Sequence, residues 1–135
     1  MKIELDHFIV PSRDETAAAR QLAGLLGVEW GKAAVGPFTA VYVNEGLTLD
    51  FQNTHEAFPV SHYCFRVSDA EFDAILARVK AAGIPYRSEA FSAMDSKVAH
   101  RYGGRGFYFE QPDGHMWEVL TASYARPPEL VADLR

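Results

Sequence analysis

One pattern of strand and helix signals occurs twice in this chain, and it restricts the fold more than any other feature. Residues 5–28, LDHFIVPSRDETAAARQLAGLLGV, parallel residues 61–84, SHYCFRVSDAEFDAILARVKAAGI. Each copy opens with an apolar run that suits a strand, continues with apolar residues at helical spacing and closes near a glycine. The repeat therefore predicts two copies of one strand–helix unit.

The flanking residues predict where these elements begin. We expect the first strand over residues 2–10, followed by a helix that Ser12 caps, with Glu15 completing a capping box. In the second copy, Ser68 and Glu71 form the equivalent box. Both helices should therefore start directly after their strands.

Three further strand candidates follow each helix. The last of them begins after a turn glycine, Gly46 or Gly114, and carries an acid four residues later, Asp50 or Glu118. Each half is therefore a βαβββ module, which makes the chain an α+β protein. The second half is longer because a polar loop over residues 91–104 precedes its last hairpin.

The chain has 135 residues, enough for one domain with its own core. Within this single domain we place the first module at residues 1–53 and the second at residues 60–122. A C-terminal tail follows at residues 123–135 and is predicted as an arm or a short helix.

Composition and charge exclude several classes of partner. The net charge of −5 gives no reason to expect binding to nucleic acid or to an anionic membrane surface. No apolar run approaches the roughly 20 residues that a membrane span needs. The single cysteine, Cys64, has no partner for an internal disulfide, which fits a reducing compartment. We expect a cytoplasmic protein.

The repeat pairs four residues that can bind metal. His7 and His62 lie in the first strands of the two halves, and Asp50 and Glu118 lie in the last strands. A carboxylate such as Glu118 in an apolar strand is costly to bury unless it is paired or bound to a metal. A single histidine in a strand is more commonly structural, but two imidazoles and two carboxylates at equivalent places favour a divalent first-row metal. For Asp50, an exposed strand acid beside a turn remains the alternative.

A second group of polar residues lies in and after the long loop. The segment AMDSKVAHRYGGRG, residues 93–106, is either a solvated loop or a lid that presents cations to an anionic substrate. Tyr108 follows in the next strand and either reaches a pocket or packs. The candidate substrate-binding residues are Lys97, His100, Arg101, Arg105 and Tyr108.

The motifs LDHFIV, SHYCFRV and GFYFEQPDGHMWEVL resemble those of the vicinal oxygen chelate superfamily, and the resemblance covers nearly the whole chain. This superfamily contains glyoxalase I, methylmalonyl-CoA epimerase, extradiol dioxygenases, fosfomycin-resistance transferases and bleomycin-resistance proteins. The resemblance implies that the two modules form a cupped mixed β-sheet, or half-barrel, with the helices outside. It also implies a homodimer.

The same resemblance implies a metal site. His7, His62 and Glu118 match three ligands that most catalytic members share. Asp50 lies where glyoxalase I has a glutamate, and its shorter side chain reaches the metal either directly or through water. The implied cofactor is a divalent Zn, Ni, Co, Fe or Mn ion that binds two substrate oxygens, with Glu118 or Asp50 as the catalytic residue that moves the proton.

Among the superfamily's activities, the single-domain length favours a metal-dependent lyase or isomerase of the glyoxalase or epimerase kind, acting on a small oxygen-rich molecule. An extradiol ring-cleavage dioxygenase is an alternative, because two histidines and one carboxylate make the facial triad of such enzymes. A non-enzymatic drug-binding protein of the bleomycin-resistance kind is the third. Ile9 and Gly106 replace a threonine and a serine of the fosfomycin enzymes, which argues against that substrate.

Overall fold

The structure is a computed structural model and describes residues 2–130. The chain forms two compact units, the first ending at Pro59 and the second beginning at Val60. None of the helices in this described part has the length and apolar character needed to cross a bilayer. The last five residues of the predicted tail, 131–135, lie outside the described residues.

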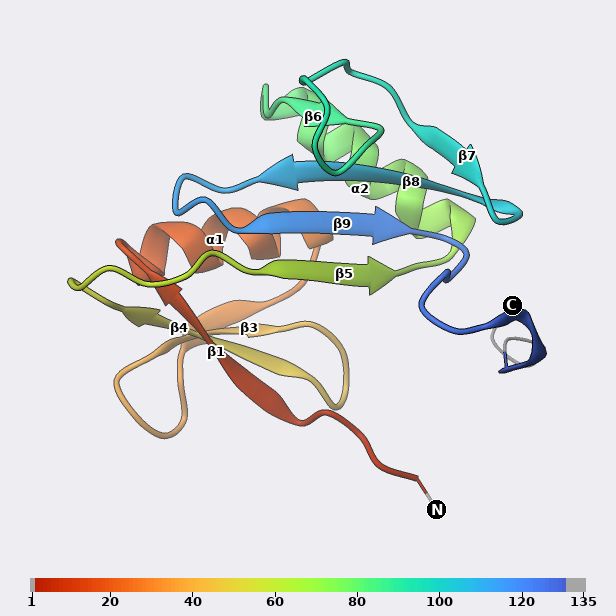
Figure 1. Cartoon of the computed structure of the whole chain (residues 1–135). Helices are drawn as coiled ribbons and strands as arrows, with labels where there is room; N and C mark the ends of the chain where they lie inside the picture. Colours follow the sequence, from red (N-terminus) through yellow and green to blue (C-terminus); the bar gives the residue numbers. More distant parts are fainter. Residues whose placement is uncertain (1, 131–135) are drawn as a thin grey trace. The chain divides into compact units, whose positions relative to one another are not determined.

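The first unit contains one helix and one four-stranded sheet (Figure 1). Its elements are β1 (His7–Ser12), α1 (Glu15–Leu26), β2 (Trp30–Lys32), β3 (Thr39–Tyr42) and β4 (Thr48–Asn53). The strand order is β1-β4-β3-β2, with β1 parallel to β4 and the other pairs antiparallel. The first strand of the unit thus lies next to its last strand.

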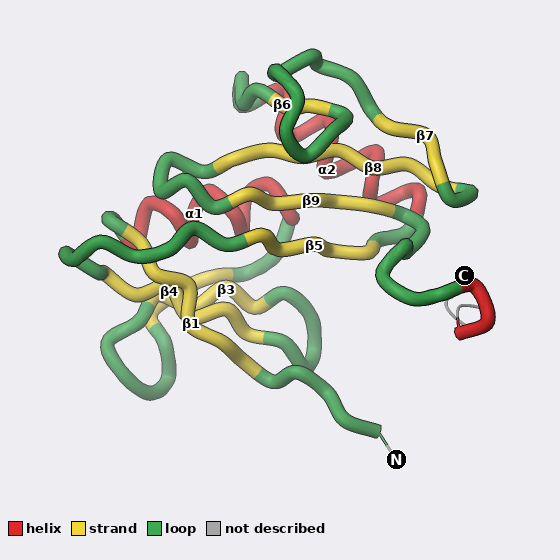
Figure 2. The backbone as a smooth tube through the Cα atoms, viewed as in Figure 1, coloured by secondary structure: helices red, strands yellow, loops and turns green. Residues whose placement is uncertain are grey.

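The second unit repeats this plan with one additional strand. Its elements are β5 (His62–Arg66), α2 (Asp69–Ala81), β6 (Tyr86–Arg87), β7 (Ala99–Arg101), β8 (Gly104–Glu110), β9 (Met116–Leu120) and a 3-10 turn, η1 (Pro128–Leu130). The strand order is β5-β9-β8-β6, with β7 also paired to β8. Figure 2 shows β5, β9 and β8 side by side. The predicted α+β class with a duplicated βαβββ plan is confirmed.

One face of each sheet packs against the helix of its own unit. In the first unit Leu49 and Phe51 of β4 are fully buried, as is Leu22 of α1. In the second unit the Phe72 ring on α2 meets the Phe107 ring on β8 edge to face, with centroids 5.4 Å apart. Because side chains alternate across a strand, the residues between these apolar positions point to the opposite face of each sheet.

The predicted start of the first helix was wrong by two residues. Asp14 is the N-cap, and its Oδ1 accepts a 3.1 Å hydrogen bond from the Ala17 N–H. Ser12 belongs to β1 instead, where it pairs with Asn53. Its hydroxyl accepts from the Asp14 N–H at 3.1 Å and so shapes the turn before the helix. The capping box of Ser68 and α2 is confirmed.

The long polar loop contains a strand that the sequence pattern did not predict. Residues Ala99–Arg101 form β7, which pairs with the start of β8 across the two-residue turn Tyr102-Gly103. Both turn residues have positive φ, 57° for Tyr102 and 77° for Gly103. This is the conformation of a type I′ turn, which matches the twist of a hairpin. Type I′ turns usually have asparagine, aspartate or glycine at the first position, so the tyrosine there concealed this turn in the sequence.

Candidate metal centre

Strand pairing gives the two histidine–acid pairs the same backbone register. In each unit, the histidine of the first strand pairs with the residue two positions before the acid of the last strand. His7 and Asp50 therefore occupy the same relative places as His62 and Glu118. Each pair lies on the sheet face that points away from the helix of its own unit.

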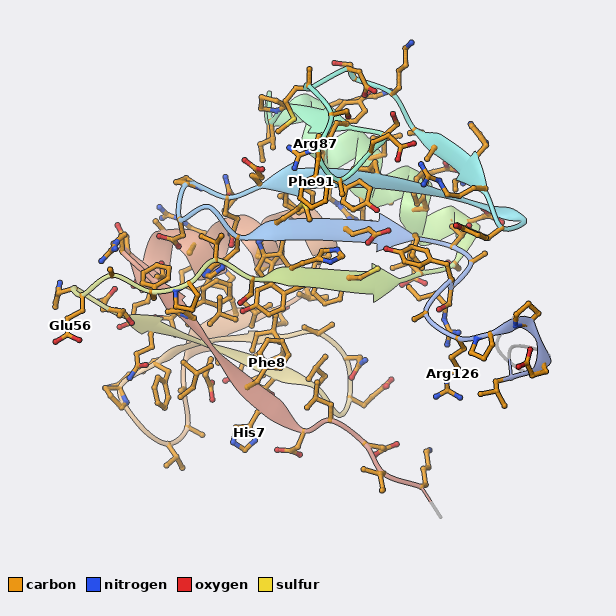
Figure 3. The ribbon with its side chains drawn as sticks, viewed as in Figure 1. His7, Phe8, Glu56, Arg87, Phe91 and Arg126 are labelled. Atoms are coloured by element: carbon orange, nitrogen blue, oxygen red, sulfur yellow. The ribbon has the colours of Figure 1, made fainter. Side chains whose placement is uncertain are left out.

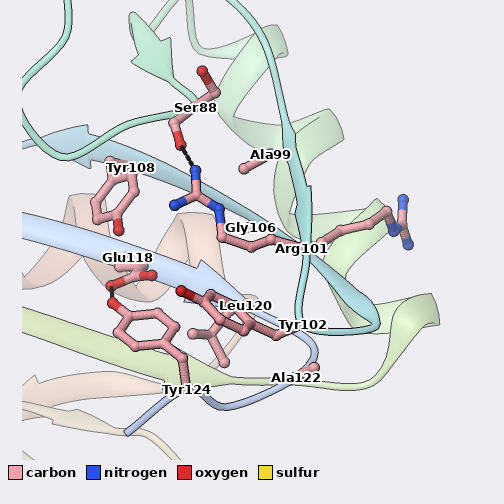
Figure 4. Close-up of a pocket in the computed structure, with 11 residues that line it drawn as sticks. Ser88, Ala99, Arg101, Tyr102, Gly106, Tyr108, Glu118, Leu120, Ala122 and Tyr124 are labelled. Atoms are coloured by element: carbon pink, nitrogen blue, oxygen red, sulfur yellow. Dashed lines mark hydrogen bonds between the residues drawn. The ribbon is translucent and has the colours of Figure 1, made fainter.

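The pair in the second unit is in direct contact. The Nε2 of His62 lies 2.9 Å from Oε1 of Glu118, and the Glu118 side chain is only 3% exposed. The Tyr124 hydroxyl donates a second hydrogen bond, of 2.6 Å, to the same carboxylate oxygen (Figure 4). The buried carboxylate of Glu118 is thus satisfied by an imidazole and a phenol.

The pair in the first unit lines an open groove. His7 and Phe8 leave β1 on opposite sides (Figure 3), and His7 shares a groove of about 420 Å³ with Asp50 and Tyr42. The Nδ1 of His7 lies 2.6 Å from Oδ2 of Asp6. This hydrogen bond and the Asp6 charge raise the pKa of His7, and the Asp50 carboxylate raises it further. The Nδ1 atom of His7 is therefore held by a carboxylate.

The donor atoms of the second pair fit a metal ion. Two ligands about 2.1 Å from one ion and at right angles to each other are about 3.0 Å apart. The 2.9 Å separation between His62 and Glu118 matches that spacing. Within residues 2–130 no group of three or more histidine, cysteine or acidic side chains lies in a metal-binding arrangement. Each unit by itself supplies two of the four predicted ligands.

The predicted substrate-binding residues are divided by strand alternation. Arg101 and Tyr108 lie on the same side of the sheet as Glu118, and all three line a cavity of about 20 Å³ (Figure 4). That volume is enough for one water molecule. Arg101 donates to the Ser88 carbonyl at 3.3 Å and to the Glu89 carboxylate. Burial raises the pKa of Tyr108.

Of the other three predicted residues, Arg105 also lines this cavity, whereas Lys97 and His100 do not. The Arg105 guanidinium turns to α2, where it donates to Asp73 at 2.7 Å and to Asp69 at 3.1 Å. His100 is the strand partner of Arg105 and is exposed near the same end of α2. The Lys97 side chain is exposed, and only its backbone N–H is held, by Asp95 at 3.0 Å.

Two polar residues near this site were not predicted from the sequence. Tyr124 lies six residues after Glu118 and beyond the repeat, so it has no counterpart that could have marked it. Arg87 is 5% exposed and donates to the Ala90 carbonyl at 2.8 Å and to Glu110 at 3.0 Å. Its position in a two-residue strand gave no periodic signal.

Cys64 corrects a further expectation. Because Cys64 lies two residues after His62 in an apolar strand, the sequence favours a small buried thiol on the same face as His62, but the residue is exposed. It pairs across the strands with Glu118, on the face that α2 does not cover. Desolvation of the thiol and the neighbouring carboxylate raise the pKa of Cys64 to about 12.

No model of a known protein family matches the chain, and no curated protein sequence matches it. Among solved structures, oxidase ChaP-H2 is 39% identical, with a TM-score of 0.85 over 93% of this chain and 98% of that chain. Oxidase ChaP-H1 is 36% identical, with a TM-score of 0.84 over 93% of this chain and 100% of that chain. Lactoylglutathione lyase from Agrobacterium tumefaciens is 20% identical, with a TM-score of 0.63 over 87% of this chain and 92% of that chain. The two oxidases are thus similar over their full length, whereas the lyase shares the fold.

Proposed function

Because the chain belongs to the vicinal oxygen chelate superfamily, we propose that it is a metal-dependent enzyme that oxidises a small, oxygen-rich molecule. Full-length similarity to two oxidases, at 39% and 36% identity, supports oxidation over the lyase or isomerase chemistry that the single-domain length favours. Lactoylglutathione lyase is more distant, at 20% identity.

The observation that carries this proposal is the matched placement of a histidine and an acid in both units. We assign His7, His62 and Glu118 as metal ligands and Asp50 as a fourth, direct or through water. The assignment requires that one His7–Asp50 pair and one His62–Glu118 pair bind the same ion. The two pairs come either from one chain or from two chains of a homodimer.

The ion would supply Lewis acidity and open positions for two neighbouring substrate oxygens, with Fe or Mn suited to oxidation and Zn, Ni or Co to lyase or isomerase work. The protein's own residues provide the surroundings. Burial of Glu118 keeps water from its carboxylate, and the Tyr108 and Tyr124 hydroxyls are the proton-bearing groups beside it. Arg101 adds positive charge to the wall of the same cavity.

A lyase or isomerase acting on a similar molecule is the second candidate, and Asp50 is the observation that favours it. Its carboxylate is half-buried and lines the same groove as His7. A carboxylate beside a metal can take a proton from a carbon next to a bound carbonyl and return it elsewhere. Such an enzyme would exchange substrate protons with solvent without consuming oxygen.

The test combines metal analysis with two activity measurements. The purified chain would be loaded in turn with Fe²⁺, Mn²⁺, Ni²⁺ or Zn²⁺ and supplied with catechols and α-hydroxy ketones. Metal-dependent oxygen uptake that is lost in His62→Ala and Glu118→Ala supports the oxidase. The exposed His55→Ala is the matched control and should behave as the parent. Proton exchange without oxygen uptake would favour the lyase, and a parent that binds no metal would favour a drug-binding protein.

Complementation tests how the two pairs meet. His7→Ala and Glu118→Ala each remove one ligand, from the first and the second unit respectively. If the site is shared between two chains, a mixed dimer of these variants contains one intact site and regains activity. If the site forms within one chain, the mixture stays inactive. Sedimentation of the parent checks that the dimer exists.

A further inference from the structure

We infer that Tyr124 is a positioning residue for Glu118, whose hydroxyl fixes the carboxylate so that its metal-binding oxygen faces His62. The inference rests on the proposed function, because it concerns one of the proposed ligands. Tyr124 adds a residue from outside the repeat to that site, contributed by the segment that follows β9.

The contact itself is short and directed. The Tyr124 hydroxyl donates to Oε1 of Glu118 at 2.6 Å, within the range of a hydrogen bond from a neutral hydroxyl to an ionised oxygen. The same oxygen lies 2.9 Å from Nε2 of His62. Because the carboxylate is 3% exposed, water has little access to replace the phenol. The hydroxyl therefore restricts rotation of the carboxylate about its last bond.

Tyr124 is itself held in place. The preceding Thr121 exchanges hydrogen bonds with Arg105, since its backbone N–H donates at 2.9 Å and its hydroxyl accepts at 2.9 Å. The Tyr124 ring also lies against the Tyr102 ring, with centroids 5.6 Å apart. A rigid support of this kind is what orients a metal ligand.

A purely packing role for Tyr124 makes a different prediction. In that case its ring would matter and its hydroxyl would not, so Tyr124→Phe would leave metal binding unchanged. The phenylalanine keeps the ring contact with Tyr102 and a partly exposed position, so the variant should fold. Tyr102→Phe is the matched control, because it removes a hydroxyl from the neighbouring ring.

The experiment is a titration of chelator-treated protein with Co²⁺, followed by visible absorption and by circular dichroism for folding. We expect Tyr124→Phe to bind Co²⁺ about 10–100-fold more weakly than the parent and to shift its absorption bands, because losing a residue that orients a ligand has costs of this size. Tyr102→Phe should match the parent in both.

Two failures are distinguishable. If the parent binds Co²⁺ and the folded Tyr124→Phe binds it with the same affinity and spectrum, the role of Tyr124 is overturned and the proposed function stands. If the parent itself takes up no metal, the proposed function and the inference fall together.

Discussion

The imidazole of His62 lies 2.9 Å from the carboxylate of Glu118, although 56 positions separate them in the chain. Parallel pairing of β5 with β9 brings them together. The carboxylate is buried on one side by Tyr124 and on the other by its strand partner Tyr108. The hydrogen bonds with His62 and Tyr124 offset only part of the cost of burying an ionised carboxylate.

Glu118→Gln should therefore have opposite effects with and without metal. We expect the metal-free variant to be more stable than the metal-free parent by about 1 kcal/mol, because a neutral amide is cheaper to bury than a carboxylate. The variant should also lose the rise in melting temperature that a bound metal gives the parent. Thermal unfolding with chelator or with added Co²⁺ measures both, and a metal-free variant less stable than the parent would contradict the argument.

Gly104→Ala should destabilise the second unit. A Cβ at this position would lie 2.6 Å from the Thr121 hydroxyl and 2.7 Å from the Ala122 Cβ, so the segment leading to Tyr124 would have to move. We expect a loss of about 1–3 kcal/mol in the free energy of unfolding, as for other overpacked sites.

Gly106→Ala in the same strand is the control for this change. Its Cβ would meet nothing closer than 3.5 Å, which is ordinary contact. Urea unfolding of both variants gives the comparison, and equal stability of the two would show that the segment after β9 yields without cost.

Arg87→Lys should destabilise the chain although it conserves the charge. The guanidinium of Arg87 uses its fork to bind the Ala90 carbonyl and Glu110 together, and it is almost fully buried. A lysine ammonium cannot reproduce both directions, so we expect a loss of about 2 kcal/mol. The exposed Arg126→Lys should change stability by less than about 0.5 kcal/mol. Similar unfolding midpoints for the two variants would refute the structural role of Arg87.

The repeat accounts for what could be predicted. Equivalent motifs in the sequence match His7 with His62 and Asp50 with Glu118, and strand pairing within each half follows from the same local pattern. The glycine that ends the first helix was predicted as well, and it adopts φ of 74°.

What could not be predicted depended on contacts outside the repeat. The Tyr102-Gly103 turn creates β7, and alternation along β7 then sends Arg101 and His100 to opposite faces. The segment 93–106, considered as a single cationic lid, therefore contains some residues that lie near Glu118 and others that lie near α2. Tyr124 could not be predicted either, because its local sequence does not indicate a contact with the carboxylate of Glu118, six residues earlier.

His7 should titrate above the ordinary histidine pKa of 6.5, and Asp6→Asn should lower its pKa. The hydrogen bond to Asp6 favours the protonated ring and is the largest cause of the shift. A raised pKa means that the ion pair stabilises the folded state below the ordinary value and that this contribution is lost as pH rises through the raised one. A proton NMR titration of the ring measures both proteins, with His55 as an internal reference. An unchanged His7 pKa in the variant would show that Asp6 does not hold the ring in solution.

Cys64 should be a slow thiol in spite of its exposure. A pKa of about 12, against an ordinary 9.0, lowers the reactive thiolate at mildly alkaline pH by about a thousandfold. Reaction with an aromatic disulfide should therefore be far slower for the folded chain than for the chain in urea. Desolvation is the largest cause and the Glu118 charge the next, so Glu118→Gln should speed the reaction without reaching the unfolded rate. A folded parent that reacts as fast as the unfolded chain would mean that Glu118 and its sheet do not shield the sulfur.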